Sequence, residues 1–185
     1  MKLFYRSDQL NQMEDLMEVD SFKYTSRLVS RYYRMTQIGK DLPIPWTPLA
    51  KALSQSKFGL VTSGGLYNPE KEPPFDLARE SREPTWGDPT FRTIPVDINP
   101  ETIGVSHHHI NGAKVKEDMN ILLPVQRFQE FAEDGEIGAL AEQAYSFMGY
   151  QGYPADQSGW KELYGPQVAN RLLEDGVDCV LLTAA

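Results

Sequence analysis

The sequence has a single cysteine, Cys179, among its 185 residues. One thiol cannot form an intramolecular disulfide, so a disulfide-stapled secreted scaffold is excluded and a reducing compartment is indicated. Long apolar runs are missing too: no stretch approaches the roughly 20 apolar residues of a membrane-spanning helix. The N-terminus turns polar directly after residue 5, which does not fit a signal peptide. We therefore expect a cytoplasmic protein with no membrane partner.

Clustered positive charge is also scarce. The chain has 18 Lys and Arg against 26 Asp and Glu, a formal net charge of −8. Proteins that bind a nucleic-acid backbone gather basic side chains on one surface, so we expect no nucleic-acid partner. One local basic excess falls on a predicted helix, where we interpret it as a solvated face. It consists of Lys23, Arg27, Arg31 and Arg34.

The first 45 residues are predicted to form a helical arm and a proline-rich connector. Residues 7–39 lack proline and have glycine only at their end, which favours two helices broken near residue 20. Pro43, Pro45 and Pro48 then block helix formation and favour extended backbone. We therefore divide the chain into an arm with its connector, residues 1–45, and an α/β domain, residues 46–185.

Alternating strands and helices predict the architecture of this domain. Residues 57–63 and 177–183 have the short apolar composition of buried strands, and 160–174 has that of a helix leading into the second strand. A helix between two strands is typical of a parallel sheet. We predict a mostly parallel, Rossmann-like α/β sheet in which both strands are central. The sequence further favours strands at 103–107 and 145–150 and a helix at 124–134.

A long proline-rich loop is predicted from residue 67 to residue 100. It holds seven prolines among acidic, amide and basic residues, a density that we expect to exclude regular helices. A loop of this length in a compact domain is usually functional or disordered. Four apolar side chains favour an ordered, lid-like excursion. They are Phe75, Trp86, Phe91 and Ile94.

Three consecutive histidines are the most reactive group in the sequence. At a strand end, His107 and His109 would project to one side and His108 to the other. Two imidazoles so spaced can share a metal, bind an anion or act as acid and base near neutral pH. No nearby cysteine completes a zinc site, although a turn could bring Asp118 close; the alternative is a polar loop with exposed imidazoles. We take His107 and His109 as candidate catalytic residues and assign no metal.

Ser63, Gly64 and Gly65 follow the first predicted strand, like the start of a phosphate-cradling turn. They lack the spacing of a dinucleotide-binding motif and no helix N-terminus follows, so we favour a tight turn beside a cleft. With Asp118, they are our candidate substrate-binding residues. Cys179 lies in an apolar strand, where cysteine behaves as a small buried hydrophobe rather than as a thiolate.

The sequence ends directly after the last predicted strand. In open parallel sheets the chemistry lies in loops past the carboxyl ends of the strands. We therefore expect the chain to be the N-terminal portion of a longer protein, ending where a catalytic loop would begin.

A series of short motifs resembles one known family in its order. The motifs are WTPL at 46–49, FGLVTSGG at 58–65, PFD at 74–76, GDPTFRTIP at 87–95, SHHH at 106–109, DMN at 118–120, GEIG at 135–138 and SFMG at 146–149. From residue 46 to residue 185, the chain is similar to the glycine, sarcosine, betaine and D-proline reductase selenoprotein B family.

The resemblance implies an oxidoreductase that cleaves a carbon–nitrogen bond of a small amino acid or an N-methylated derivative, with electrons from dithiols. It implies a redox centre of selenocysteine or cysteine directly after a strand like residues 180–183, so selenocysteine is expected just past Ala185. The sequence leaves open whether a UGA codon read as a stop, or an ordinary truncation or gene loss, ends the chain there. The chain alone is therefore expected to be inactive and to hold no cofactor. His107 and His109 match family histidines, whereas His108 stands where an acidic residue is expected.

The partners implied by the resemblance are a small-molecule substrate, other reductase subunits and a thioredoxin-like dithiol donor; a homo-oligomer is compatible with it. Two other functions stay open. A non-catalytic interaction domain that lost its redox loop would explain the missing thiol. A metal-dependent hydrolase would use the histidines with Asp118.

Overall fold

The computed structural model describes residues 26–28, 30–31 and 47–185. The chain divides into two units, Met1–Thr47 and Pro48–Ala185. In the first unit, residues 27–28 and 30–31 are helical, and the side chains of Arg27 and Arg31 are exposed. The predicted helices of residues 7–39 and the connector up to residue 46 otherwise lie outside the described residues.

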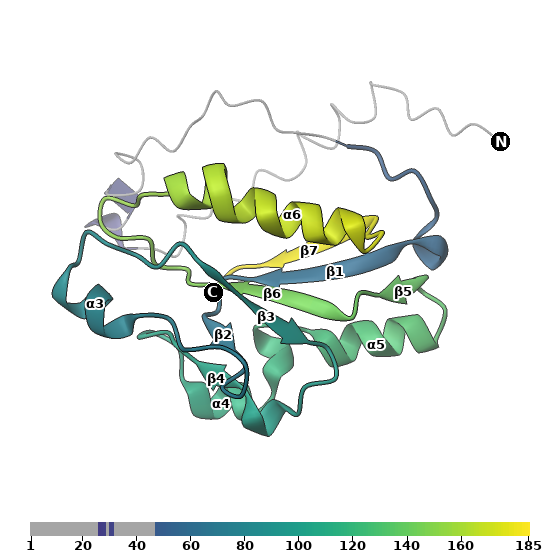
Figure 1. Cartoon of the computed structure of the whole chain (residues 1–185), viewed down its shortest axis with the longest axis horizontal. Coiled ribbons are helices and arrows are strands. Elements are labelled where there is room, and N and C mark those ends of the chain that lie inside the picture. Colours follow the sequence, from purple (N-terminus) through teal and green to yellow (C-terminus); the bar gives the residue numbers. More distant parts are fainter. Residues whose placement is uncertain (1–25, 29, 32–46) are drawn as a thin grey trace. The chain divides into compact units, whose positions relative to one another are not determined.

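A mixed, mostly parallel sheet forms the second unit (Figure 1). β1 (Lys57–Thr62) lies in its middle and pairs in parallel along one edge with β7 (Cys179–Thr183). The other edge of β1 pairs in parallel with β5 (Ala139–Leu140) and β6 (Gln143–Phe147). β3 (Phe91–Pro95) adds to β6 in antiparallel orientation. The prediction of an α/β fold with a mostly parallel sheet and a central first strand is confirmed.

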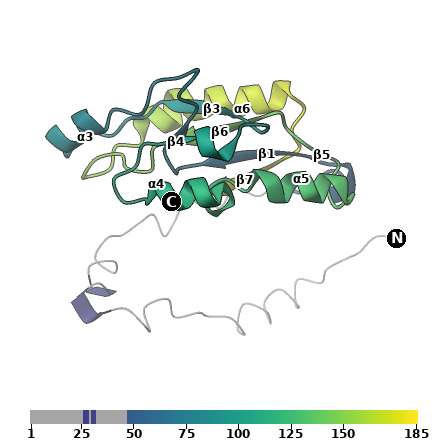
Figure 2. The same ribbon diagram turned by 90° about the horizontal axis from the view of Figure 1, so that it is seen from below.

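The last strand is not central, contrary to our prediction. Within the described residues, β7 pairs only with β1, so it lies at an edge of the sheet. Its apolar composition is that of a strand covered on both faces, but composition does not determine how many neighbours a strand has. Figure 2 shows β7 on the outer side of β1.

One helix covers the first face of the sheet. α6 (Gly165–Glu174) follows a π-helical turn at Trp160–Tyr164, so the predicted helix at 160–174 is present. α6 packs close to β1: a Cβ on Gly59 would lie 2.6 Å from Cδ2 of Leu172. Tyr145 and Leu172 are both buried in the resulting cluster.

A second layer of helices covers the other face. α4 (Gly112–Glu117) and α5 (Val125–Glu133) lie there, the latter close to its predicted range of 124–134. Leu60 of β1 and Leu123 are buried on this side in the larger of the two apolar clusters. Short 3₁₀ turns occupy Leu53–Gln55, Pro100–Thr102 and Met119–Ile121. None of the described helices combines the length and the apolar character needed to cross a membrane.

The proline-rich stretch contains regular structure, which corrects our expectation. α3 (Leu77–Arg82) forms there because no proline lies within it and the Asp76 carboxylate caps its start, accepting the N–H of Arg79 at 2.8 Å. β3 also belongs to this stretch. Phe75 and Ile94 are buried, as the sequence predicted.

The Arg92 side chain connects the start of the proline-rich stretch to the sheet. It lies on β3, is only 8% exposed, and its guanidinium carbon lies 4.1 Å from the centroid of the Phe75 ring. Its Nε donates to the carbonyl oxygen of Pro73 at 2.8 Å, and Nη2 donates to that of Pro74 at 3.2 Å. The planar guanidinium thus satisfies the backbone of the excursion while stacking on an aromatic ring.

Candidate functional site at the carboxyl end of the sheet

A glycine turn after β1 carries the chain across the end of the sheet. Gly65 has φ of +65°, and a Cβ on it would lie 2.3 Å from the carbonyl oxygen of Ser106. The N–H of Gly65 donates to the carbonyl of Phe147 at 2.9 Å, and its carbonyl accepts the N–H of Ser106 at 2.8 Å. Only glycine satisfies both the backbone angle and the close approach. This turn therefore holds Ser106, and the histidines after it, at the end of β6.

A small second sheet continues from this turn. β2 (Leu66–Tyr67) pairs antiparallel with β4 (Gly104–Val105), so the strand predicted at 103–107 is shorter than expected. The histidines follow it in a turn rather than on a strand. The rings of His107 and His109 nevertheless lie near each other, edge to face, with centroids 6.0 Å apart.

His107 reaches the carboxyl ends of the parallel strands. A Cβ on Gly149 would lie 3.6 Å from Nε2 of His107, 3.1 Å from the carbonyl oxygen of Ser63 and 3.2 Å from that of Ala185. Glycine at 149 therefore allows a close approach of the imidazole and the ends of two strand segments, where even a Cβ would be crowded. His107 therefore lies close to the carboxyl end of the final strand.

The hydrogen bonds of His107 define its chemistry. Its Nδ1 accepts the backbone N–H of His109 at 3.2 Å, which leaves the proton of the neutral ring on Nε2. Burial lowers the pKa of His107, and the neighbouring His109 and His108 lower it further. At neutral pH, His107 is therefore an uncharged imidazole with an N–H donor on Nε2, close to Gly149.

His109 contributes to the site through its backbone. Its side chain is exposed, whereas its N–H fixes the ring of His107. The structure thus brings both predicted histidines together but gives them different surroundings.

Ser63 lies at the same end of the sheet. Its Oγ accepts the N–H of Ala185 at 3.0 Å, and its own N–H donates to the carbonyl of Thr183 at 3.0 Å. A pocket of about 330 Å³ opens beside these residues on the α6 side. Its lining includes Ser63, Phe147, Trp160 and Thr183. Of the predicted substrate-binding residues, Ser63, Gly64 and Gly65 therefore lie together with His107.

Asp118 is not brought into this group by any described contact. Its Oδ1 accepts the N–H of Asn120 at 3.0 Å and the Asn120 side-chain amide at 2.8 Å, so it caps the 3₁₀ turn that follows. In the part of the chain that the structure describes, no group of three or more His, Cys, Asp or Glu side chains is placed to hold a metal. The hydrolase hypothesis, which needs Asp118 beside the histidines, finds no support in this geometry.

Glu80 is a titratable neighbour that the sequence did not reveal. It lies on α3, is 8% exposed, and its Oε1 is 3.8 Å from Nε2 of His108. Burial raises its pKa, the positive charges of His108 and His109 lower it, and Asp88 raises it. No sequence signal marked this glutamate, because it stands among other charged residues in a stretch expected to be an irregular loop.

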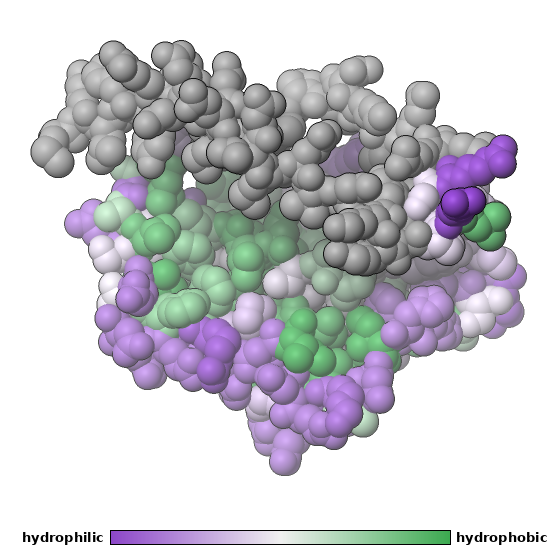
Figure 3. Space-filling model, turned by 180° about the vertical axis from the view of Figure 1, so that it is seen from behind, coloured by the Kyte–Doolittle hydropathy of each residue, from purple (hydrophilic) through white to green (hydrophobic). Residues whose placement is uncertain are grey.

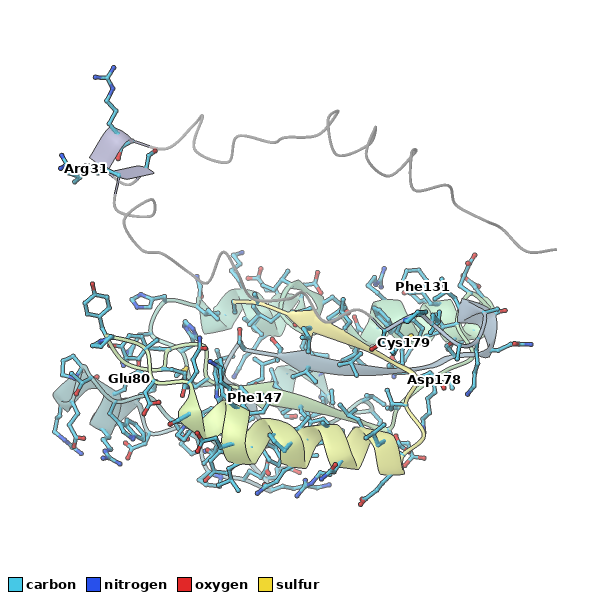
Figure 4. All side chains as sticks on the ribbon, turned by 90° about the horizontal axis from the view of Figure 1, so that it is seen from above. Arg31, Glu80, Phe131, Phe147, Asp178 and Cys179 are labelled. Atoms are coloured by element: carbon cyan, nitrogen blue, oxygen red, sulfur yellow. The ribbon has the colours of Figure 1, made fainter. Side chains whose placement is uncertain are left out.

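Cys179 lies at the other end of the sheet from this group. It is the first residue of β7 and pairs with Phe58 at the start of β1. Figure 4 shows Cys179 and Asp178 at one end of the molecule and Glu80 toward the opposite end. The thiol is half-buried.

Comparison with known proteins identifies the family. The family model for glycine/sarcosine/betaine reductase selenoprotein B matches residues 29–185, which is most of the chain. The chain belongs to this family. The match includes the β1 turn, the histidine turn and β7, so the resemblance of the motif order is confirmed. No solved structure matches the chain.

Three curated relatives of the chain are reductase subunits. It is 37% identical over 142 residues to the D-proline reductase subunit gamma of Acetoanaerobium sticklandii, a match that covers 77% of this chain and 54% of that subunit. It is 28% identical over 141 residues to the glycine reductase complex component B subunit gamma of Carboxydothermus hydrogenoformans, covering 76% and 31% of the two chains. With the sarcosine reductase complex component B subunit beta of Peptoclostridium acidaminophilum, identity is 28% over 142 residues, covering 76% and 30%. The chain thus spans about half of the first relative and less than a third of the other two.

Proposed function

We propose that this chain forms part of an amino-acid reductase of the selenoprotein B type, in which it supplies the proton-donating side of the reaction site. The reaction is the reductive cleavage of a carbon–nitrogen bond in a small amino acid or an N-methylated derivative. Two electrons and two protons replace the C–N bond by a C–H and an N–H bond, while a dithiol is oxidised to a disulfide. The observation that carries the proposal is the position of His107 Nε2 beside Ala185 and Gly149.

The family's selenol or thiol, expected just past Ala185, would attack the substrate as the nucleophile. The dithiol would then reduce the resulting intermediate and restore the selenol or thiol. Within this chain, the Nε2–H of His107 would donate a hydrogen bond to an anion bound at the carboxyl ends of β1 and β7. An uncharged donor suits this role, because its burial carries no charge desolvation cost. The His109 N–H holds the imidazole in the required tautomer.

The substrate would occupy the pocket beside Ser63. Its volume of about 330 Å³ is at the lower end of small-ligand pockets. It lies past the carboxyl ends of β1 and β7, the location where open α/β sheets bind ligands. Partner subunits and a thioredoxin-like dithiol donor belong to the same proposal, since the relatives are subunits of reductase complexes.

A chimeric subunit tests this function. The matched region of the Acetoanaerobium sticklandii D-proline reductase subunit gamma is replaced by residues 48–185 of this chain. The assembled complex is then assayed with D-proline, glycine, sarcosine or betaine and dithiothreitol as the electron donor. We expect cleavage of at least one of these substrates.

Histidine variants of the chimera distinguish a loss of catalysis from a failure of the subunits to assemble. His107→Phe removes the Nε2 donor and should lower kcat by about 100-fold, the range typical of losing one such donor. His108→Phe, which alters a 42% exposed side chain, is the matched control and should change kcat by less than about threefold. A chimera that assembles with normal mass but cleaves none of the four substrates would contradict the proposal and favour a non-catalytic domain.

A further inference from the structure

β7 presents an unpaired strand edge. The carbonyl of Thr183 accepts the N–H of Ser63, so the peptide groups of Thr183 face β1. Peptide groups alternate along a strand, so those of Leu182 and Val180 face away from β1. Among the described residues, no strand pairs with this edge. Two N–H and two C=O groups are therefore available for a further strand.

The same strand exposes apolar side chains toward the α6 side. Val180 is 43% exposed and Leu182 is 73% exposed, although both lie in a strand parallel to β1. Parallel sheets are normally covered on both faces. A long apolar strand left open at an edge also promotes aggregation. Because such a strand is normally paired and covered, β7 has the character of a strand that pairs with a further strand.

An apolar groove runs between β7 and α6. It has a volume of about 480 Å³, and its lining includes Val61, Val168, Leu173, Val180 and Leu182. Leu173 of α6 is 70% exposed along it. α6 covers the middle of the sheet but does not extend over β7. Figure 3, which views the molecule from the β7 side, shows apolar residues gathered across this face above a polar margin.

We propose that a further strand and helix of the reductase polypeptide cover this edge, with the strand bonded to β7 and the helix packed beside α6 over Val180 and Leu182. The occupant comes from the part of the subunit that this chain does not span. The relatives contain such polypeptide: this chain covers 54% of the D-proline reductase subunit gamma and 31% of the glycine reductase subunit. The proposal rests on membership of the family and not on the reductase chemistry.

Hydrogen exchange at single amides tests the proposal. The probe is the part of the Acetoanaerobium sticklandii subunit gamma outside the matched region, produced separately and added to the full chain. We expect exchange at the amides of Val180 and Leu182 to slow by at least tenfold on addition. The amide of Leu181 faces β1 and should be slow with or without the probe.

Two variants locate the contact. Leu182→Lys places a charge in the groove and should weaken binding of the probe by at least tenfold. Ile121→Lys is the matched control, because Ile121 is an exposed apolar residue, 58% exposed, that does not line the groove. Equal binding of the probe by both variants would overturn the proposal.

Two further measurements test the same strand pairing if the probe does not fold alone. In the intact subunit gamma, the amides aligned with Val180 and Leu182 should exchange as slowly as the one aligned with Leu181; fast exchange there would overturn the proposal. Light scattering of the full chain should give a monomer mass. A dimer that Leu182→Lys dissociates would show that a second copy occupies the edge, which also overturns it. None of these readouts depends on catalysis.

Discussion

His107 combines three properties that are rarely found in a surface imidazole. It is partly buried, its tautomer is fixed by the N–H of His109, and its Nε2 lies close to Gly149 and the ends of two strand segments. Protonation of this ring would require Nδ1 to give up its acceptor role and would place a charge in a partly desolvated position. The residue is therefore suited to hydrogen-bond donation at neutral pH.

The lowered pKa of His107 predicts a specific dependence of stability on pH. The unfolded state takes up a proton near pH 6.5, whereas the folded state resists protonation until a lower pH. The stabilising contribution is therefore complete above pH 6.5 and is lost as the pH falls below that value. Each unit of pKa difference is worth about 1.4 kcal/mol.

The comparison is between the wild type and His107→Gln, measured as the free energy of unfolding in urea at pH 7.5, 6.5 and 5.5. We expect the wild type to lose more stability than the variant between pH 6.5 and pH 5.5. His108→Gln removes only the smallest of the three causes of the lowered His107 pKa, so its slope should stay closer to that of the wild type than the slope of His107→Gln does. Identical slopes for the wild type and His107→Gln would contradict the assignment.

Glu80 shows how a residue outside the histidine run joins the site. Its carboxylate is buried near His108, and His108 Nε2 also lies 3.1 Å from Ser81 Oγ. The Oγ of Ser81 donates to the carbonyl of Leu77, so its lone pairs are free to accept the imidazole N–H. α3 thus contacts the histidine turn through two consecutive residues.

The turn between β1 and β2 decides where the histidines lie. It joins the main sheet to the small β2–β4 sheet, and its backbone contacts connect Gly65 to both Phe147 and Ser106. A substitution at this turn should therefore displace an element rather than a single side chain.

Gly65→Ala tests this role. Alanine at φ of +65° costs about 1–2 kcal/mol. The clash of its Cβ with the Ser106 carbonyl, at 2.3 Å, should raise the total loss of unfolding free energy to about 2–4 kcal/mol. We also expect the pKa of His107, followed by NMR, to move back toward its ordinary value as the turn shifts.

Gly135→Ala is a matched control. Gly135 has φ of +75°, but a Cβ there would meet nothing within 4 Å. Its cost should be limited to the backbone strain of about 1 kcal/mol, with no change at His107. If both variants lose the same unfolding free energy, the close approach of Gly65 to Ser106 does not affect stability.

At the scale of the whole molecule, the two ends of the sheet have different chemistry. The carboxyl end holds His107, Ser63 and the pocket beside them. The amino end of β7 holds Cys179, the one thiol of the sequence. Asp178 beside it accepts the Lys57 N–H and pairs with Lys51, which lowers the pKa of its carboxyl group.

This separation predicts that the chain by itself has no dithiol-dependent reductase activity. Exchange with a dithiol requires an accessible thiolate close to the substrate, and Cys179 lies at the opposite end of its strand from His107. The measurement is product formation from glycine, sarcosine, betaine and D-proline with excess dithiothreitol. Cleavage that disappears in Cys179→Ser would contradict the prediction, because it would show that this thiol reaches the substrate.

Local pattern by itself determined much of the fold. Strand and helix periodicity and proline geometry act over a few positions, so neighbouring residues are enough to predict the elements that depend on them. These elements are β1, the start of α5 after its proline, and the helix that leads into β7. The order of motifs likewise indicated the family. The turn at Gly64–Gly65 was predicted from the same local rules.

The tertiary structure alone decided the features that depend on distant partners. The edge position of β7 depends on which strands pair with it. β3 depends on its pairing with β6, and Arg92 on this strand donates to the distant carbonyls of Pro73 and Pro74. The proximity of Glu80 to His108, and that of Gly149 to His107, join residues that are far apart in the sequence. Sequence patterns encode local backbone preference, whereas burial, pKa and strand neighbours are set only when the packed chain brings such residues together.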